Sequence, residues 1–248
     1  MRQKQADWGI LCYNIPMLTV ETFQNAETLT AARVTADHDA WLSNETDVMS
    51  YAIPIGRVVL ASGARRHVDR FTQELDFIFG RDIPSALTGD PRGLLSKFDF
   101  GAEEYREVIA QPYTAVAGLA MDYALRCDSN AQPSYPSDAA FGLHTGIVGG
   151  YHTDHCENRT PDQPITLRFA TFWGKGGPTR FAIGPRRRSQ MRHHALLIGT
   201  PADNDLDVVT HDEGVVVCFA GAHGIHATSN LTGPRLFITT TVTLPAVR

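Results

Sequence analysis

The sequence predicts helices packed on the outside of a small β-barrel, and a change in pattern along the chain supports this fold class. Up to about Cys127, apolar residues recur with helical spacing. After a polar, proline-bearing gap at 128–138, short β-type runs follow one another, separated by Gly, Pro, Asn and Asp. No flexible linker separates the two halves. We therefore expect one domain over 1–248, with a mostly helical part at 1–128 packed on a β core at 139–245.

The helical part shows its clearest periodicity at 65–79. One face of this segment collects four apolar side chains: Val68, Phe71, Leu75 and Ile78. Further helices are expected at 26–42 and 103–127, and Pro112 should kink or divide the second of these.

The β core is expected to consist of many short strands, a pattern typical of sandwiches and barrels. The predicted strands lie at 141–148, 165–173, 179–183, 195–199, 207–210, 215–219 and 236–244. The glycine-rich segment 174–178 between two of them is expected to be a hairpin connection.

Composition excludes several classes of protein. The net charge is −5 and the pI about 6.0, whereas a nucleic-acid partner would favour a strongly basic face. No run of 18 apolar residues exists, so no membrane span is expected, and no signal peptide is recognisable. The four cysteines are widely spaced, which favours free thiols in a reducing compartment and a cytoplasmic location.

A candidate metal site stands out at His152 and Asp154. On an extended segment, residues two apart point to the same side, so this imidazole and this carboxylate aim together. His226 follows the apolar strand predicted at 215–219, and a barrel can bring it beside the first two. Two histidines and one carboxylate on one face of a metal leave the opposite positions open, as in Fe(II) enzymes that bind a cosubstrate and dioxygen.

The order of motifs resembles the iron(II)/2-oxoglutarate-dependent oxygenases. The resemblance consists of an HxD pair, a distal histidine late in the chain, and Arg235, nine residues after His226, opening a final strand. The segment 226–235 is similar to the distal motif of the phytanoyl-hydroxylase-like branch. The resemblance covers roughly 141–244 and implies a double-stranded β-helix, a squashed barrel of two antiparallel sheets.

The resemblance also implies roles for single residues. His152, Asp154 and His226 would hold Fe(II), and Arg235 would bind the distal carboxylate of 2-oxoglutarate, for which a guanidinium offers a matching planar fork. Thr239, on the same face of the strand, is a candidate second contact to that carboxylate, and Arg168 a further cofactor-binding candidate. The implied activity is hydroxylation of a C–H bond in a small molecule, consuming O2 and releasing succinate and CO2.

Alternatives remain open at this point. His223 rivals His226 as the distal ligand, and His144, in an HTG sequence, would be the ligand of a halogenating variant. His155 is expected to point away from the metal. The competing function is a cupin-like metal enzyme, or a small-molecule-binding barrel, that does not use 2-oxoglutarate; neither requires a buried cation at Arg235.

Overall fold

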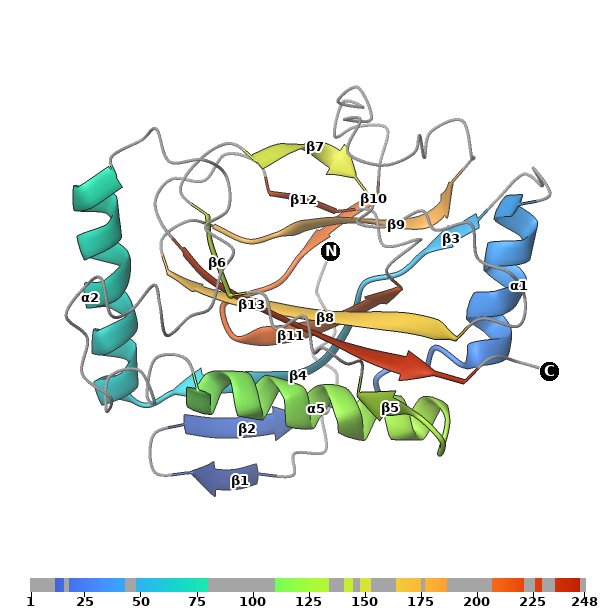
Figure 1. Cartoon of the computed structure of the whole chain (residues 1–248), viewed down its shortest axis with the longest axis horizontal. Helices are drawn as coiled ribbons and strands as arrows, with labels where there is room; N and C mark the ends of the chain where they lie inside the picture. The colour runs from blue at the N-terminus through green and yellow to red at the C-terminus, as the bar shows by residue number, and fades with distance from the viewer. Residues whose placement is uncertain are drawn as a thin grey trace, which may run out of the picture.

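The structure of the chain is a computed structural model. It describes residues 12–15, 18–42, 48–79, 110–133, 141–144, 148–152, 164–174, 177–186, 207–220, 226–228 and 235–245. Within these ranges the protein is mostly β, with two antiparallel sheets and a few helices (Figure 1).

The larger, 8-stranded sheet is built around two long central strands, β8 (Ile165–Gly174) and β13 (Arg235–Leu244). Its strand order is β1-β2-β4-β11-β8-β13-β5, with β6 also pairing with β13. The remaining strands are β1 (Cys12–Ile15), β2 (Leu18–Thr22), β4 (Ile53–Leu60), β11 (Val215–Ala220), β5 (Gln132–Pro133) and β6 (Phe141–His144). All of its pairings are antiparallel.

The smaller, 5-stranded sheet faces the central strands of the larger one (Figure 1). Its order is β10-β9-β12-β7, and β3 pairs with β9. The strands are β10 (Asp207–Thr210), β9 (Arg180–Arg186), β12 (His226–Thr228), β7 (Val148–His152) and β3 (Val48–Ser50).

In the described ranges three helices flank the sheets: α1 (Ala31–Leu42), α2 (Ser62–Phe79) and α5 (Gln111–Cys127). Helix α5 crosses the outer face of the larger sheet (Figure 1) and buries Val116, Leu119 and Tyr123 there. Its apolar residues at i, i+3 and i+7 fall on one side, which is why this helix packs on a flat surface.

Both faces of the larger sheet are buried, so its central strands supply two cores. On β8, Leu167 and Phe169 belong to the core under α5, whereas Ala170 belongs to the core between the two sheets. Alternate residues of a strand point to opposite faces, so one strand serves both cores. This explains why β8 and β13 read as nearly continuous apolar or threonine-rich runs.

The strand predictions for the second half agree with the structure. The predicted runs 165–173, 207–210, 215–219 and 236–244 correspond to β8, β10, β11 and β13, and 179–183 falls on β9. The run 141–148 includes β6 and the first residue of β7, and both 145–147 and 195–199 lie outside the described residues.

The prediction of a mostly helical first half is not confirmed. Helices occur at all three expected places, and Pro112 lies in the first turn of α5, where proline is tolerated because the N–H it lacks would have no partner. However, β1 to β4 also lie in this half, and β4 pairs with β11 in the larger sheet. The N-terminal residues therefore help to build the sheets as well as cover them.

The hairpin expected at 174–178 is wrong. Strand β8 belongs to the larger sheet and β9 to the smaller one, so the segment between them crosses from one sheet to the other. Glycine at a connection of this length marks a tight turn equally well in both situations, and only the sheet pairing distinguishes them. No helix among the described residues is long and apolar enough to cross a membrane.

Gly214, in the turn before β11, occupies a position that only glycine fits. Its φ of 75° lies in the left-handed region, and a Cβ there would come within 2.3 Å of the Val58 carbonyl oxygen. Its N–H donates to the Phe172 carbonyl oxygen, and its own carbonyl accepts from the Val58 N–H. The turn thus joins β4, β8 and β11 through backbone contacts alone.

We predict that Gly214→Ala lowers the free energy of unfolding by roughly 2–4 kcal/mol, from left-handed strain plus the clash. Urea denaturation measures this. Gly118→Ala is the matched control: it sits on an exposed part of α5 with no atom within 4 Å of the new Cβ, and should raise stability by up to about 1 kcal/mol. Equal effects of the two substitutions would contradict the assignment of the turn.

Candidate metal and anion site

Two of the expected metal ligands lie opposite one another in the smaller sheet. Strand β12 pairs with β7 in antiparallel fashion, and His226 is the Cα partner of His152. Neighbouring strands lie about 4.8 Å apart, so the register brings the backbones of two residues 74 positions apart in the sequence side by side. His152 ends β7 and His226 begins β12, so both stand at one edge of the ladder.

The His226 side chain is buried among aromatic rings. Its exposed fraction is 7%, its ring centroid is 5.2 Å from that of Phe219, and the Phe181 ring is 6.2 Å away. Phe219 comes from the larger sheet and Phe181 from the smaller one, so His226 lies between the two sheets rather than on the outside.

The rest of the expected ligand set lies outside the described residues. This applies to Asp154 and to the rival positions His155 and His223. The part of the chain that the structure describes contains no group of three His, Cys, Asp or Glu side chains able to hold a metal, and Asp154 is not part of it.

Arg235 opens β13 and is completely buried, with an exposed fraction of 0%. Its Nη1 donates a hydrogen bond of 3.0 Å to the Gly177 carbonyl oxygen in the crossover between the sheets. Its guanidinium carbon lies 5.4 Å from the ring centroid of Phe172 and 5.2 Å from that of Phe237. The aromatic faces offset part of the cost of removing this cation from water.

Two nitrogens of Arg235 have no partner among the described residues. Nε and Nη2 are both buried and make no hydrogen bond there. They form one side of the planar guanidinium, where two N–H bonds run parallel, which is the edge that chelates a carboxylate. Burial lowers the pKa of Arg235 to about 9, because the charged form loses its contact with water. The site has the chemistry of a carboxylate receptor.

Arg235 and His226 lie at different levels of the larger sheet, because the Phe219 ring beside His226 belongs to the Cα partner of Arg168, six residues along β8 from Gly174. Arg235 is the Cα partner of Gly174, the last residue of β8. From Gly174 the chain crosses to β9, where Phe181 is the Cα partner of His226. The short crossover therefore links the strand end beside Arg235 directly to the strand beside His226.

The other predicted cofactor residues lie further away. Thr239 is buried opposite Ala170, four residues along β13 from Arg235, or about 13 Å of strand. Arg168 is half-buried, opposite Thr241 and six residues before Gly174, or about 20 Å of strand. At that separation Arg168 and Arg235 do not bind the same carboxylate. His144 is a Cα partner of Arg235 on the other side of β13.

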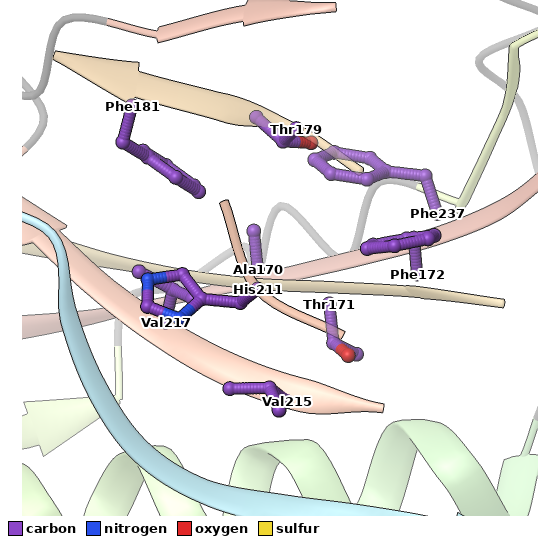
Figure 2. A pocket seen from close by; sticks show the side chains of 9 residues that line it. All are labelled: Ala170, Thr171, Phe172, Thr179, Phe181, His211, Val215, Val217 and Phe237. Atoms are coloured by element: carbon purple, nitrogen blue, oxygen red, sulfur yellow. The ribbon is translucent and has the colours of Figure 1, made fainter. Parts of the chain in front are cut away.

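A small cavity lies between the sheets, and Figure 2 shows the side chains that line it. Phe172 and Phe237 rise into it from the larger sheet, while Thr179 and Phe181 point down from the smaller one. The remaining lining residues are Ala170, Thr171, His211, Val215 and Val217. Phe172 and Phe237 are also the two rings that flank the Arg235 guanidinium.

His211 and Thr179 are polar groups of this cavity that sequence reasoning missed. The His211 Nε2 and the Thr179 Oγ1 are buried and have no hydrogen-bond partner among the described residues. Burial lowers the pKa of His211, against a weaker opposing effect of Asp212, so the imidazole is neutral at physiological pH. Alternation from Phe181 could have placed Thr179 on the inner face, but nothing local marks His211.

Comparison with known proteins gives only weak likenesses. No family model matches the chain, and no curated protein matches it. Among solved structures, SnoK, a non-heme alpha-ketoglutarate-dependent carbocyclase from nogalamycin biosynthesis, shares 15% identity over 89% of this chain and 87% of its own, with a TM-score of 0.41.

Two further structures are similar to the same degree. The non-heme alpha-ketoglutarate-dependent epimerase SnoN from nogalamycin biosynthesis shares 14% identity over 87% of this chain and 83% of its own (TM-score 0.38). HygX from Streptomyces hygroscopicus, with nickel and 2-oxoglutarate bound, shares 13% identity over 84% of this chain and 86% of its own (TM-score 0.37). Likenesses of this size leave the chemistry of this chain to be judged from its own residues.

We predict that Arg235→Met raises the free energy of unfolding of the ligand-free protein by about 1–4 kcal/mol, because an apolar side chain of similar length replaces a buried charge for which the described residues supply no anionic partner. Urea denaturation of both proteins without added carboxylate or metal measures it. A less stable variant would mean that the contacts to Gly177 and the two rings outweigh the desolvation of the cation.

Proposed function

We propose that this chain is an Fe(II)/2-oxoglutarate-dependent dioxygenase. His152, Asp154 and His226 hold the iron, Arg235 binds the distal carboxylate of 2-oxoglutarate, and O2 is the second cosubstrate. The substrate is a small molecule hydroxylated at a C–H bond. The two facing antiparallel sheets support the double-stranded β-helix that this class of enzyme uses, and the phytanoyl-hydroxylase-like motif at 226–235 favours that branch.

The observation that carries the proposal is the edge of Arg235 formed by Nε and Nη2, which has no partner within the described part of the chain. A buried charge without an anionic partner is strongly disfavoured, so a protein keeps one where a ligand completes it. The Nε and Nη2 pair, held in place by the Gly177 hydrogen bond and by two aromatic rings, presents a preorganised fork of the width of a carboxylate. A barrel that binds no carboxylate-bearing ligand would not require this buried arginine edge.

The pairing of His226 with His152 supports the metal assignment. Asp154 follows His152 by two residues, a spacing that directs both to one side of an extended segment. Two neutral imidazoles and one carboxylate leave a divalent ion with a net positive charge, and a chelating 2-oxo acid balances it. The position of His226 between the sheets favours it over His223 as the distal ligand.

In this proposal the residues of the chain bind and orient the metal and the cosubstrate, and they exclude water from the site. When bound, iron and 2-oxoglutarate supply the oxidising chemistry for attack on an unactivated C–H bond. Arg235 fixes one end of the cosubstrate at the mouth of β13, and the metal ligands fix the other end at the edge of β7 and β12. Phe172, Phe181 and Phe237 line the cavity between the sheets, Phe219 packs on Phe181, and these rings exclude water from the space that they surround.

We predict that 2-oxoglutarate added to the anaerobic Fe(II) protein produces the weak visible charge-transfer band of the chelate. Asp154→Ala removes the anionic protein ligand, so at the same iron concentration the band should be lost and substrate hydroxylation abolished. Circular dichroism should show an unchanged fold.

The controls separate the proposed function from its rivals. Asp69→Ala removes a surface carboxylate that pairs with Arg65 on α2, and it should leave the band unchanged. Iron binding without any band on addition of 2-oxoglutarate would favour the cupin-like alternative. An unchanged band in the Asp154 variant would remove Asp154 from the site.

We predict that Arg235→Lys weakens 2-oxoglutarate binding by about ten- to a hundredfold, because a lysine replaces two parallel charge-assisted hydrogen bonds with one point charge. Calorimetric titration with Mn(II) in place of iron measures this. Metal affinity should be largely unchanged. Arg57→Lys, at a surface ion pair with Asp212, is the control and should not affect either affinity. An Arg235→Lys protein that binds 2-oxoglutarate as tightly as the wild type would assign the carboxylate to another cation.

A further inference from the structure

The backbone bonds between β8 and the chain leading into β11 stop just before Gly174, where a side chain replaces them. The last of these bonds runs from the Gly214 N–H to the Phe172 carbonyl oxygen. Gly174 is the next residue of β8 whose N–H points to this side, because the backbone groups of a strand alternate between its two neighbours. Glu213 Oε1 accepts that N–H at 2.8 Å. A carboxylate therefore completes the strand end that pairs with Arg235.

The Glu213 carboxylate is itself held from helix α2. Arg65 Nη1 forms an ion pair with Glu213 Oε2, and Arg65 Nη2 donates a 3.3 Å hydrogen bond to Glu213 Oε1. The hydrogen bond to Glu213 raises the pKa of Arg65, so the guanidinium stays charged. A two-pronged contact of this kind between half-buried groups restricts the carboxylate in direction as well as in distance. Both oxygens of Glu213 therefore have fixed positions at the end of β8.

Gly174 also begins the crossover to which Arg235 is bonded. Three residues after it, the Gly177 carbonyl oxygen accepts the 3.0 Å hydrogen bond from Arg235 Nη1. Gly174 and Gly177 have φ values of 118° and 79°, and glycine tolerates many conformations, so a crossover built on them needs an anchor where it begins. Because the guanidinium is planar, the direction of the Nη1 bond also sets the direction of the opposite edge, formed by Nε and Nη2.

The geometry points to Glu213 as a positioning residue for Arg235. Glu213 fixes the Gly174 N–H, Gly174 fixes the start of the crossover, and the Gly177 carbonyl oxygen fixes the guanidinium. Arg65 extends this series of contacts to α2. Glu213 acts through the reach of its carboxylate and not through its charge, and it touches neither the metal nor the cosubstrate. The inference rests on the proposed function, because its effect is measured through 2-oxoglutarate bound at Arg235.

Two conservative substitutions separate the reach of this side chain from its charge. Glu213→Asp keeps the charge but is one methylene shorter, which takes the acceptor away from the Gly174 N–H. Glu213→Gln keeps an acceptor at the same length and removes the charge. Affinities are measured by calorimetry on the full chain loaded with Mn(II). We expect Glu213→Asp to weaken 2-oxoglutarate binding by about three- to tenfold, and Glu213→Gln to bind it as the wild type does.

A reference ligand and a matched control complete the test. 2-Oxopentanoate chelates a metal with the same atoms as 2-oxoglutarate and has the same chain length, but it lacks the distal carboxylate. Its affinity, and that of Mn(II), should be the same in all variants, because the orientation of Arg235 concerns only that carboxylate. Asp69→Ala removes the other carboxylate paired with Arg65, at 3.0 Å from Nε, and leaves the Glu213 contact to Gly174 in place. This control should bind both ligands as the wild type does.

Three results would overturn the inference: equal weakening of both ligands by Glu213→Asp, no weakening of either, or a loss of 2-oxoglutarate affinity in Glu213→Gln as large as in Glu213→Asp. Failure of the proposed function looks different in the same experiment. A wild-type protein that binds Mn(II) but does not bind 2-oxoglutarate removes the cosubstrate and, with it, the role of Glu213. A wild-type protein that binds 2-oxoglutarate, with an unaffected Glu213→Asp variant, keeps the function and removes only the inference.

Discussion

The antiparallel pairing of β8 with β13 is the interaction on which the rest of the structure depends. It runs without interruption over ten residue pairs, from Arg235 beside Gly174 to Leu244 beside Ile165. Because both faces of these strands are covered, each contributes alternate side chains to the core under α5 and to the core between the sheets. A slip of one residue would exchange the two sets, so the two cores together specify the register.

That register also decides where the buried cation lies. Arg235 is the first residue of β13, so its position follows from the pairing of the ten residues beginning with it. The apolar cores supply the stability that lets the chain bury a guanidinium whose Nε and Nη2 have no partner among the described residues. A local loss of stability of this kind is typical of ligand sites, where a bound ligand supplies the hydrogen-bond partners that the buried polar groups lack in the empty site.

The end of β8 is anchored from the outside as well. Glu213 Oε1 accepts a 2.8 Å hydrogen bond from the Gly174 N–H, and the same carboxylate forms an ion pair with Arg65 of α2. This pairing raises the pKa of Arg65, so the guanidinium is firmly charged. Gly174 is the Cα partner of Arg235, so the contact holds in place the strand end that carries the proposed carboxylate site.

The sequence by itself determined the local patterns: the strands of the second half, the three helices, the HxD pair and the arginine nine residues after His226. These rest on periodicity and short spacings, which a single segment carries within itself. Only the tertiary structure decided that β2 and β4 join the larger sheet, that 174–178 crosses between sheets, and that Thr179 and His211 line a cavity between the sheets. Those outcomes depend on pairing between residues far apart in the chain, such as Val58 with Gly214, and no local pattern contains that information.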